Sequence, residues 1–147
     1  MKKPMLSEHF SFDELTGSNK FPDLVEKNRF EAAAFTDKLG QLCRDLLEPI
    51  RAQFGPVVVT SGYRCPALNA AIGGVETSQH AIAEAADFIV PGRDLDTVFD
   101  WIRCSNLEFG QVILEPGWIH LSLGVPYRPD AKCHEILIYD GHTYRKA

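Results

Sequence analysis

The stretch between residues 111 and 123 constrains the fold of this chain more than any other. Two short apolar segments, Gln111–Glu115 and Trp118–Leu123, both have the alternation of a β-strand and are separated only by Pro116-Gly117. A connection of two residues joins antiparallel neighbours, because a parallel pair would need a crossover of a dozen residues or more. The sequence therefore predicts a β-hairpin.

That hairpin determines which side chains face the same way. If Glu115 pairs with Trp118 across the turn, then Ile113 pairs with His120. Side chains alternate across a strand, so all four share one face. Glu115 is then a diagonal neighbour of His120, at roughly 7 Å. We expect one strand face that carries a carboxylate and an imidazole close together.

Helices are expected before the hairpin. Residues 1–30 are predicted to be an irregular lead-in with one local helical turn. A helix is then predicted from Glu31 to about Phe54, which Pro49 should kink or end early. Its apolar stripe comprises Phe35, Leu39, Leu42, Leu46 and Ile50. A short helical turn is expected at Pro66–Ala71.

Further strands flank the hairpin along the chain. The β-branched run Val57–Thr60 predicts a buried strand, Ala85–Val90 a second and Glu135–Asp140 the last. Asp94–Cys104 predicts a short amphipathic helix between them. Early helices followed by a small, largely antiparallel sheet make an α+β fold.

Length and composition narrow the class of protein. A chain of 147 residues fits a single domain spanning 1–147, and 45% hydrophobic with 24% charged residues is ordinary for a globular protein. The net charge of -5 argues against nucleic-acid binding, which needs a basic patch. No apolar run reaches the roughly 18 residues of a membrane span. The start lacks an apolar signal region, so we expect synthesis in the cytoplasm without a signal peptide.

Two histidines and one aspartate suggest a metal site. His80 and Asp87 lie in the string SQHAIAEAAD, and His120 lies in WIHLS. Two histidines and a carboxylate are a ligand set of catalytic zinc, in which the fourth position stays open for water or substrate. As separate residues they have simpler interpretations: His120 as a half-buried strand residue, and Asp87 as a solvated strand end.

The spacing of His80 and Asp87 restricts how they can meet. On one helix, seven residues would rise about 10 Å. Two ligands at about 2.0–2.2 Å from one zinc lie only some 3–4 Å apart. The chain must therefore bend between them, with His80 on a loop and Asp87 on the strand that follows.

Five strings in this order resemble the zinc D-alanyl-D-alanine peptidase family, in particular its small phage- and prophage-borne branch. They are FSFDEL, LEPIR, VTSGYRCPALNAAIGG, SQHAIAEAADF and WIHLS, and they run over most of the chain. Members cleave peptidoglycan stem peptides, and the family shares its fold with the hedgehog signalling domain. The resemblance therefore implies a hedgehog-like, DD-peptidase-like fold.

Residue roles follow from the resemblance. It implies that one zinc ion is held by His80, Asp87 and His120. Arg64, in SGYR, would bind a substrate carboxylate, and Ser78 would add a hydrogen bond near the metal or substrate. A surface ion pair for Arg64 and a turn position for Ser78 are the alternatives.

Two positions depart from the family pattern. Ala83 stands where the family usually has glycine, and alanine is tolerated there unless the position needs a positive φ. Many members place an acidic base two or three residues before the last histidine, whereas this chain has Gly117 and Trp118 there. The nearest acid is Glu115, which we expect to act as general base; its alternative is an exposed turn carboxylate. Trp118 is expected to form a pocket wall, or else to belong to the core.

The functional hypothesis is a zinc-dependent peptidase that cleaves peptidoglycan stem or cross-link peptides, as a D,D-carboxypeptidase or an endopeptidase of the phage-lysis type. It would act on the cell wall after release during lysis or as a virion component, and as a monomer. One alternative is a catalytically weak or inactive cell-wall or virion binding module that keeps the fold and the metal. A metal-free structural domain is another.

Overall fold

The computed structural model describes residues 4–124, 127 and 129–147. Its helices are α1 (Phe12–Thr16), α2 (Val25–Ala32), α3 (Thr36–Leu42), α4 (Glu48–Phe54), α5 (Pro66–Ile72) and α6 (Leu95–Cys104). Short 3-10 helices are η1 (Pro22–Leu24), η2 (Ala33–Phe35) and η4 (Gln79–Ile82), and η3 (Cys43–Leu47) is a π-helical turn. The strands are β1 (Val58–Ser61), β2 (Ala85–Ile89), β3 (Phe109–Glu115), β4 (Trp118–Leu123), β5 (Glu135–Tyr139) and β6 (Tyr144–Lys146).

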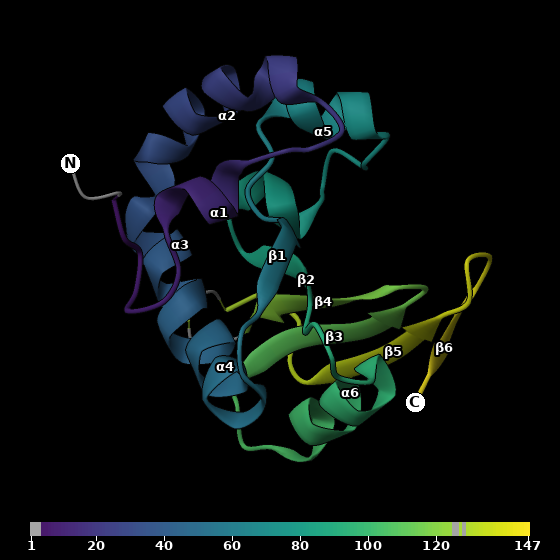
Figure 1. The fold of residues 1–147 in the computed structure, drawn as a ribbon. Helices are drawn as coiled ribbons and strands as arrows, with labels where there is room; N and C mark the ends of the chain where they lie inside the picture. Colours follow the sequence, from purple (N-terminus) through teal and green to yellow (C-terminus); the bar gives the residue numbers. More distant parts are fainter. Residues whose placement is uncertain (1–3, 125–126, 128) are drawn as a thin grey trace.

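The strands form one sheet in the order β1-β2-β4-β3-β5-β6. All neighbouring pairs are antiparallel except β3 and β5. Figure 1 shows α2, α3 and α4 in an arc along one side of the molecule, with α6 packed against β3 at another. The predicted α+β fold with N-terminal helices and a largely antiparallel sheet is confirmed. Among the described residues, no helix combines the length and apolar character that crossing a membrane requires.

The hairpin has the predicted register. Glu115 is opposite Trp118, and Ile113 is opposite His120. The other face of β4 is buried in the core through Ile119, Leu121 and Leu123. Since one face packs against the core, a shift of one residue would expose that apolar row and is excluded.

The N-terminal segment is more ordered than predicted. Residues 16–30 were expected to be irregular, but η1 begins at Pro22 and α2 begins at Val25. Pro22 occupies the first turn of η1, where its missing N–H is no loss. The α2 sequence lacks an apolar stripe, and its buried side chains are Asn28 and Ala32. Its helix therefore depends on contacts made by distant parts of the chain, which local periodicity does not reveal.

Of the two effects predicted for Pro49, an early end of the helix does not occur; the helix is instead distorted just before the proline. Helical backbone continues through α4 to Phe54. The turn before Pro49 widens into the π-helical η3, in which the Glu48 N–H donates to the Cys43 carbonyl. A proline ring normally clashes with the carbonyl four residues before it, and the wider turn relieves that clash. The predicted stripe is buried at Leu39, Leu42, Leu46 and Ile50, with Phe35 packed at its margin.

Two strands differ from their predictions. The Val57–Thr60 run was expected to be buried, but β1 lies at the edge of the sheet and Val58 is 45% exposed. β6 was not predicted, because Tyr144–Lys146 has no apolar pattern; all three residues are exposed, Tyr144 to 57%. The remaining strands, α5 and α6 agree with prediction to within one or two residues at each end.

Candidate metal centre

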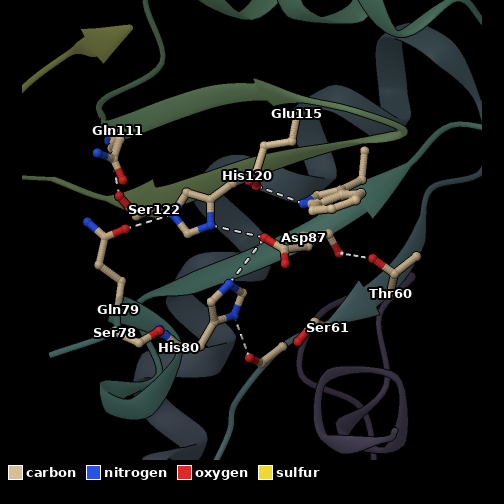
Figure 2. Close-up of polar contacts among 12 residues, drawn as sticks. Thr60, Ser61, Ser78, Gln79, His80, Asp87, Gln111, Glu115, His120 and Ser122 are labelled. Carbon is tan, nitrogen blue, oxygen red and sulfur yellow. Dashed lines mark hydrogen bonds and ion pairs between the residues drawn. The ribbon is translucent and has the colours of Figure 1, made fainter. Parts of the chain in front are cut away.

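Three elements bring the predicted metal ligands together (Figure 2). Asp87 on β2 is directly opposite His120 on β4 in the antiparallel ladder. His80 lies on η4, which bends the chain ahead of β2. The predicted bend and the strand position of Asp87 are confirmed, whereas His80, which was predicted on a loop, lies in the 3-10 helix η4.

The three side chains converge on one carboxylate oxygen. His80 Nε2 lies 3.1 Å from Asp87 Oδ1, and His120 Nδ1 lies 3.0 Å from the same oxygen. One candidate ligand atom from each residue lies within 4.8 Å of the others, and all three residues are buried. The two nitrogen–oxygen separations of 3.1 and 3.0 Å are close to the 3–4 Å expected between two ligands of one zinc.

The second nitrogen of each imidazole also faces an acceptor. His80 Nδ1 lies 2.8 Å from the Gly62 carbonyl oxygen, and His120 Nε2 lies 2.7 Å from Gln79 Oε1. A neutral imidazole has only one N–H to donate. If these outer contacts take the protons, two nitrogen lone pairs point at a carboxylate oxygen.

That arrangement fits a cation. A metal ion between the nitrogens and the carboxylate would accept all of these lone pairs, which otherwise face and repel one another. An outer acceptor that fixes the tautomer of a ligating histidine is a usual feature of metal sites. The residues present therefore fit a divalent metal, and Gln79 and Gly62 would orient its imidazoles.

Asp87 is held as an anion. In the metal-free protein, burial by itself would raise the pKa of its carboxyl group, but the charge of a protonated His80 and hydrogen bonds from imidazole nitrogens that carry a proton on the Asp87 side lower it well below the usual range. A metal ligand must be deprotonated, so this carboxylate is in the required form.

The bend that carries His80 contains a strained residue. The Ser78 hydroxyl accepts a hydrogen bond from the His80 backbone N–H at 3.2 Å and caps η4. Ala83 ends η4 with φ 61° and ψ 30°, in the left-handed region. Alanine there costs roughly 1–2 kcal/mol relative to a right-handed backbone. Position 83 therefore does need a positive φ, the case in which alanine is less favourable than the glycine usual in the family.

A cleft of approximately 380 Å³ opens over the three residues. All the other predicted site residues line it: Arg64, Ser78, Glu115 and Trp118. Sequence reasoning missed further lining residues, namely Val75, Thr77, Gln79, Gln111, Lys132 and Tyr144, and it placed Ile113 on this face.

Glu115 faces the cleft from the end of β3. Its Oε2 accepts a hydrogen bond from Trp118 Nε1 at 2.8 Å, which fixes the carboxylate beside the indole (Figure 2). Burial and the negative charge of Asp87 raise the pKa of Glu115. Glu115 is only partly accessible. It is therefore not the exposed turn carboxylate of the alternative interpretation.

Arg64 is anchored beside the metal ligands. Its Nε donates to the Ser61 hydroxyl at 3.0 Å, and its Nη2 lies 3.4 Å from Asp87 Oδ2. Its Nη1 contacts Asn69 Oδ1 at 3.4 Å. Only 12% of its side chain is exposed. The simple surface ion pair is therefore wrong, since this guanidinium lies at a buried junction of the cleft wall.

The loop that carries Arg64 is tied to the N-terminal helices by Asn28. This side chain is fully buried and donates to the carbonyls of Thr16 and Tyr63, both at 2.9 Å. It also accepts from the Cys65 backbone N–H at 2.7 Å. Asn28 thus holds the residues on both sides of Arg64.

Comparison with known proteins agrees with this geometry. A protein-family model described as Peptidase M15 matches residues 8–122, which is well over half of the chain. The match contains the three candidate metal ligands as well as Arg64, Ser78, Glu115 and Trp118. A search of curated proteins finds no match.

Proposed function

The chain belongs to the peptidase M15 family, and on that premise we propose that it hydrolyses stem or cross-link peptides of peptidoglycan. The family implies a zinc metallopeptidase that acts on peptidoglycan in general. The observation that carries the proposal is the buried convergence of His80, Asp87 and His120 at the base of a cleft.

These three residues would hold a single zinc ion. Zinc supplies Lewis-acid polarisation of a carbonyl and lowers the pKa of water towards neutrality. Gly62 and Gln79 hold the imidazoles by their outer nitrogens at 2.8 and 2.7 Å. The ligands are therefore positioned by the fold before any metal binds.

Glu115 is the proposed general acid–base. It would take a proton from the attacking water and pass it to the leaving amine. A carboxylate with an ordinary pKa is a weak base near neutral pH, and a raised pKa improves the match. Burial of its side chain shifts the pKa of Glu115 in that direction. The Trp118 N–H occupies only Oε2, so Oε1 is available to water.

Arg64 is the proposed anchor for a substrate carboxylate. A guanidinium has five N–H donors, and the contacts to Ser61, Asn69 and Asp87 described above use three of them. The remaining donors suit a planar carboxylate. Ser78 and Trp118 would contribute a hydroxyl and an indole wall to the same cleft.

The alternative is a binding module without catalytic turnover. It is suggested by the position of Glu115, which departs from the position of the acidic base in many family members. Glu115 lies five residues before His120 rather than two or three. The hairpin compensates for this distance along the chain, because Glu115 lies on β3 and shares the cleft with His120. That position supports a peptidase over a binding module.

The proposal is tested with zinc-loaded protein on cross-linked peptidoglycan. We expect new amino groups to be released, and a chelator to abolish their release. Glu115→Gln should lower the rate by about 10²–10⁴, the usual contribution of a general acid–base. Glu108→Gln is the matched control, because Glu108 is an exposed acid just before the same strand.

Two results would contradict the proposal. Zinc retention without any release of amino groups would favour the binding module. An unchanged rate in Glu115→Gln would remove this residue from the mechanism while leaving the metal site intact. Mass spectrometry of the products identifies the bond that is cut and so separates carboxypeptidase from endopeptidase action.

A further inference from the structure

The part of the chain beyond the family match contributes to the cleft. The match ends at residue 122, yet Lys132 and Tyr144 are both among the residues that line the cleft. Tyr144 belongs to β6 and packs on Tyr139 of β5, with ring centroids 4.4 Å apart. The segment that follows β4 therefore supplies part of the lining of the cleft, through Lys132 and Tyr144.

The ammonium group of Lys132 is accessible to a ligand. Its side chain is 57% exposed, and Nζ lies 3.9 Å from Glu135 Oε2. That separation is longer than a hydrogen bond. The other carboxylate oxygen, Glu135 Oε1, accepts from Gln111 Nε2, so Glu135 is fixed on the β3 side. The lysine ammonium keeps donors for a further partner, because it has three.

Arg64 and Lys132 lie on opposite sides of the candidate metal centre. Arg64 contacts Asp87 on β2, whereas Lys132 approaches Glu135 at the start of β5. In the sheet, β4 and β3 separate these two strands. Three strand spacings of about 4.8 Å put the strands of Asp87 and Glu135, which these cations contact, roughly 14 Å apart across the sheet. His120, on β4, lies between them.

This separation matches a short peptide. An extended chain advances about 3.3–3.6 Å per residue, so this distance corresponds to roughly four residues. A peptide lying across the strands above His120 would therefore meet a cation on each side of its scissile bond.

We propose that Lys132 binds a carboxylate of the substrate on the side of the cleft opposite Arg64. The inference rests on the proposed peptidase function and adds a specificity requirement to it. The preferred substrate is a peptide that carries one carboxylate on each side of the bond that is cut. Amidation of the group that faces Lys132 removes the negative charge and weakens binding.

Binding is measured by calorimetry in the zinc-loaded Glu115→Gln background, so that the peptide is not consumed. The probes are synthetic stem pentapeptides, one with all carboxylates free and others with each carboxylate amidated in turn. Lys132→Ala should weaken binding of the free peptide about fivefold, as expected for a partly exposed ion pair. The loss should shrink at high salt. Lys132→Arg should retain the affinity.

Lys27 provides a matched control. It is 58% exposed and lies 3.8 Å from Glu31 on α2, so its surroundings resemble those of Lys132. Lys27→Ala should leave the affinity unchanged for every peptide. The result that would support the proposal has two parts. The free peptide binds Lys132→Ala more weakly than the parent, whereas one of the amidated peptides binds both proteins with the same affinity.

The outcomes separate the two proposals. Equal affinities of parent and Lys132→Ala for all peptides would overturn the role of Lys132 and leave the peptidase function standing. Absence of binding by any peptide to any variant would overturn the proposed function, and the role of Lys132 with it. A loss that is the same for free and amidated peptides would also refute a carboxylate-binding role.

Discussion

Replacement of Asn28 tests how the fold supports the site. Its side chain joins three backbone groups, the carbonyls of Thr16 and Tyr63 and the N–H of Cys65, at 2.7–2.9 Å. Asn28→Ala would leave these groups without their partner in a region closed to water. The substitution therefore acts on α1, on α2 and on the loop that carries Arg64.

The magnitude follows from these contacts. An unsatisfied buried polar group costs about 1–3 kcal/mol. With partial relaxation of three such groups, we expect Asn28→Ala to lower the free energy of unfolding by about 3–5 kcal/mol. A domain of this size is stable by roughly 5–15 kcal/mol, so the variant should remain folded but close to its limit.

Asn28→Asp separates hydrogen bonding from shape. The aspartate keeps the oxygen that accepts from the Cys65 N–H. Its second oxygen replaces the amide NH₂ and so faces the carbonyl oxygens of Thr16 and Tyr63. Burial beside these carbonyls would raise the pKa of the new carboxyl group in the folded state. Folding then takes up a proton, so the loss of stability is smallest below the unfolded pKa of about 3.9 and grows as pH rises.

Urea denaturation followed by circular dichroism measures both effects, and Asn106→Ala is the control. Asn106 is exposed, and its substitution should change stability by less than about 0.5 kcal/mol. A cost below about 1 kcal/mol for Asn28→Ala would refute the reasoning, because three buried bonds would then contribute no more than one. Peptide affinity in the folded variant should also fall, since Asn28 holds both neighbours of Arg64.

Three further outcomes are expected. Ala83→Gly should change the free energy of unfolding by less than about 1 kcal/mol, because relief of the left-handed strain offsets the loss of a buried methyl group. The control Ala86→Gly, in β2, has no such strain to relieve and should lower the free energy of unfolding by about 1–2 kcal/mol. Equal losses for the two variants in urea denaturation would contradict this reasoning. Burial raises the pKa of Cys43 from 9.0 to about 12. As pH rises, the thiol therefore ionises first in the unfolded state, and the free energy of unfolding should fall by about 1 kcal/mol between pH 8 and 10. Cys43→Ala should reduce this dependence of stability on pH. Zinc at a hundredfold excess over its dissociation constant should stabilise the protein by about 2.7 kcal/mol in thermal melts, and a His80→Ala variant that gains as much would exclude the proposed ligand.

Local patterns were sufficient to place the residues of the hairpin and to predict the bend before Asp87. The turn of two residues fixed the register of the hairpin, and the alternation of side chains then placed Glu115 and His120 on one face. The spacing of His80 and Asp87 excluded a continuous helix because zinc ligands must lie close together. Both arguments use short-range geometry, which a single sequence contains.

Contacts between distant segments could not be predicted in this way. Asn28 appeared to lie in an irregular stretch, because its partners are 12 to 37 residues away in the chain. Gln79 reaches His120 across 41 residues. Lys132 enters the cleft only because β5 pairs with β3 in parallel, a pairing that no local pattern indicated. The edge position of β1 likewise depends on the order of the whole sheet.

The carboxylate of Asp87 has two oxygens with different neighbours. Oδ1 faces both imidazoles, and Oδ2 lies 3.4 Å from Arg64. A substrate carboxylate that shares the guanidinium with Asp87 neutralises part of its positive charge, so less of the Asp87 charge is offset and its hold on a cation is stronger. Binding equilibria at two sites that share a group are reciprocal. Metal and substrate carboxylate should therefore each tighten the binding of the other by the same factor, so that the protein retains its ion best while it is occupied.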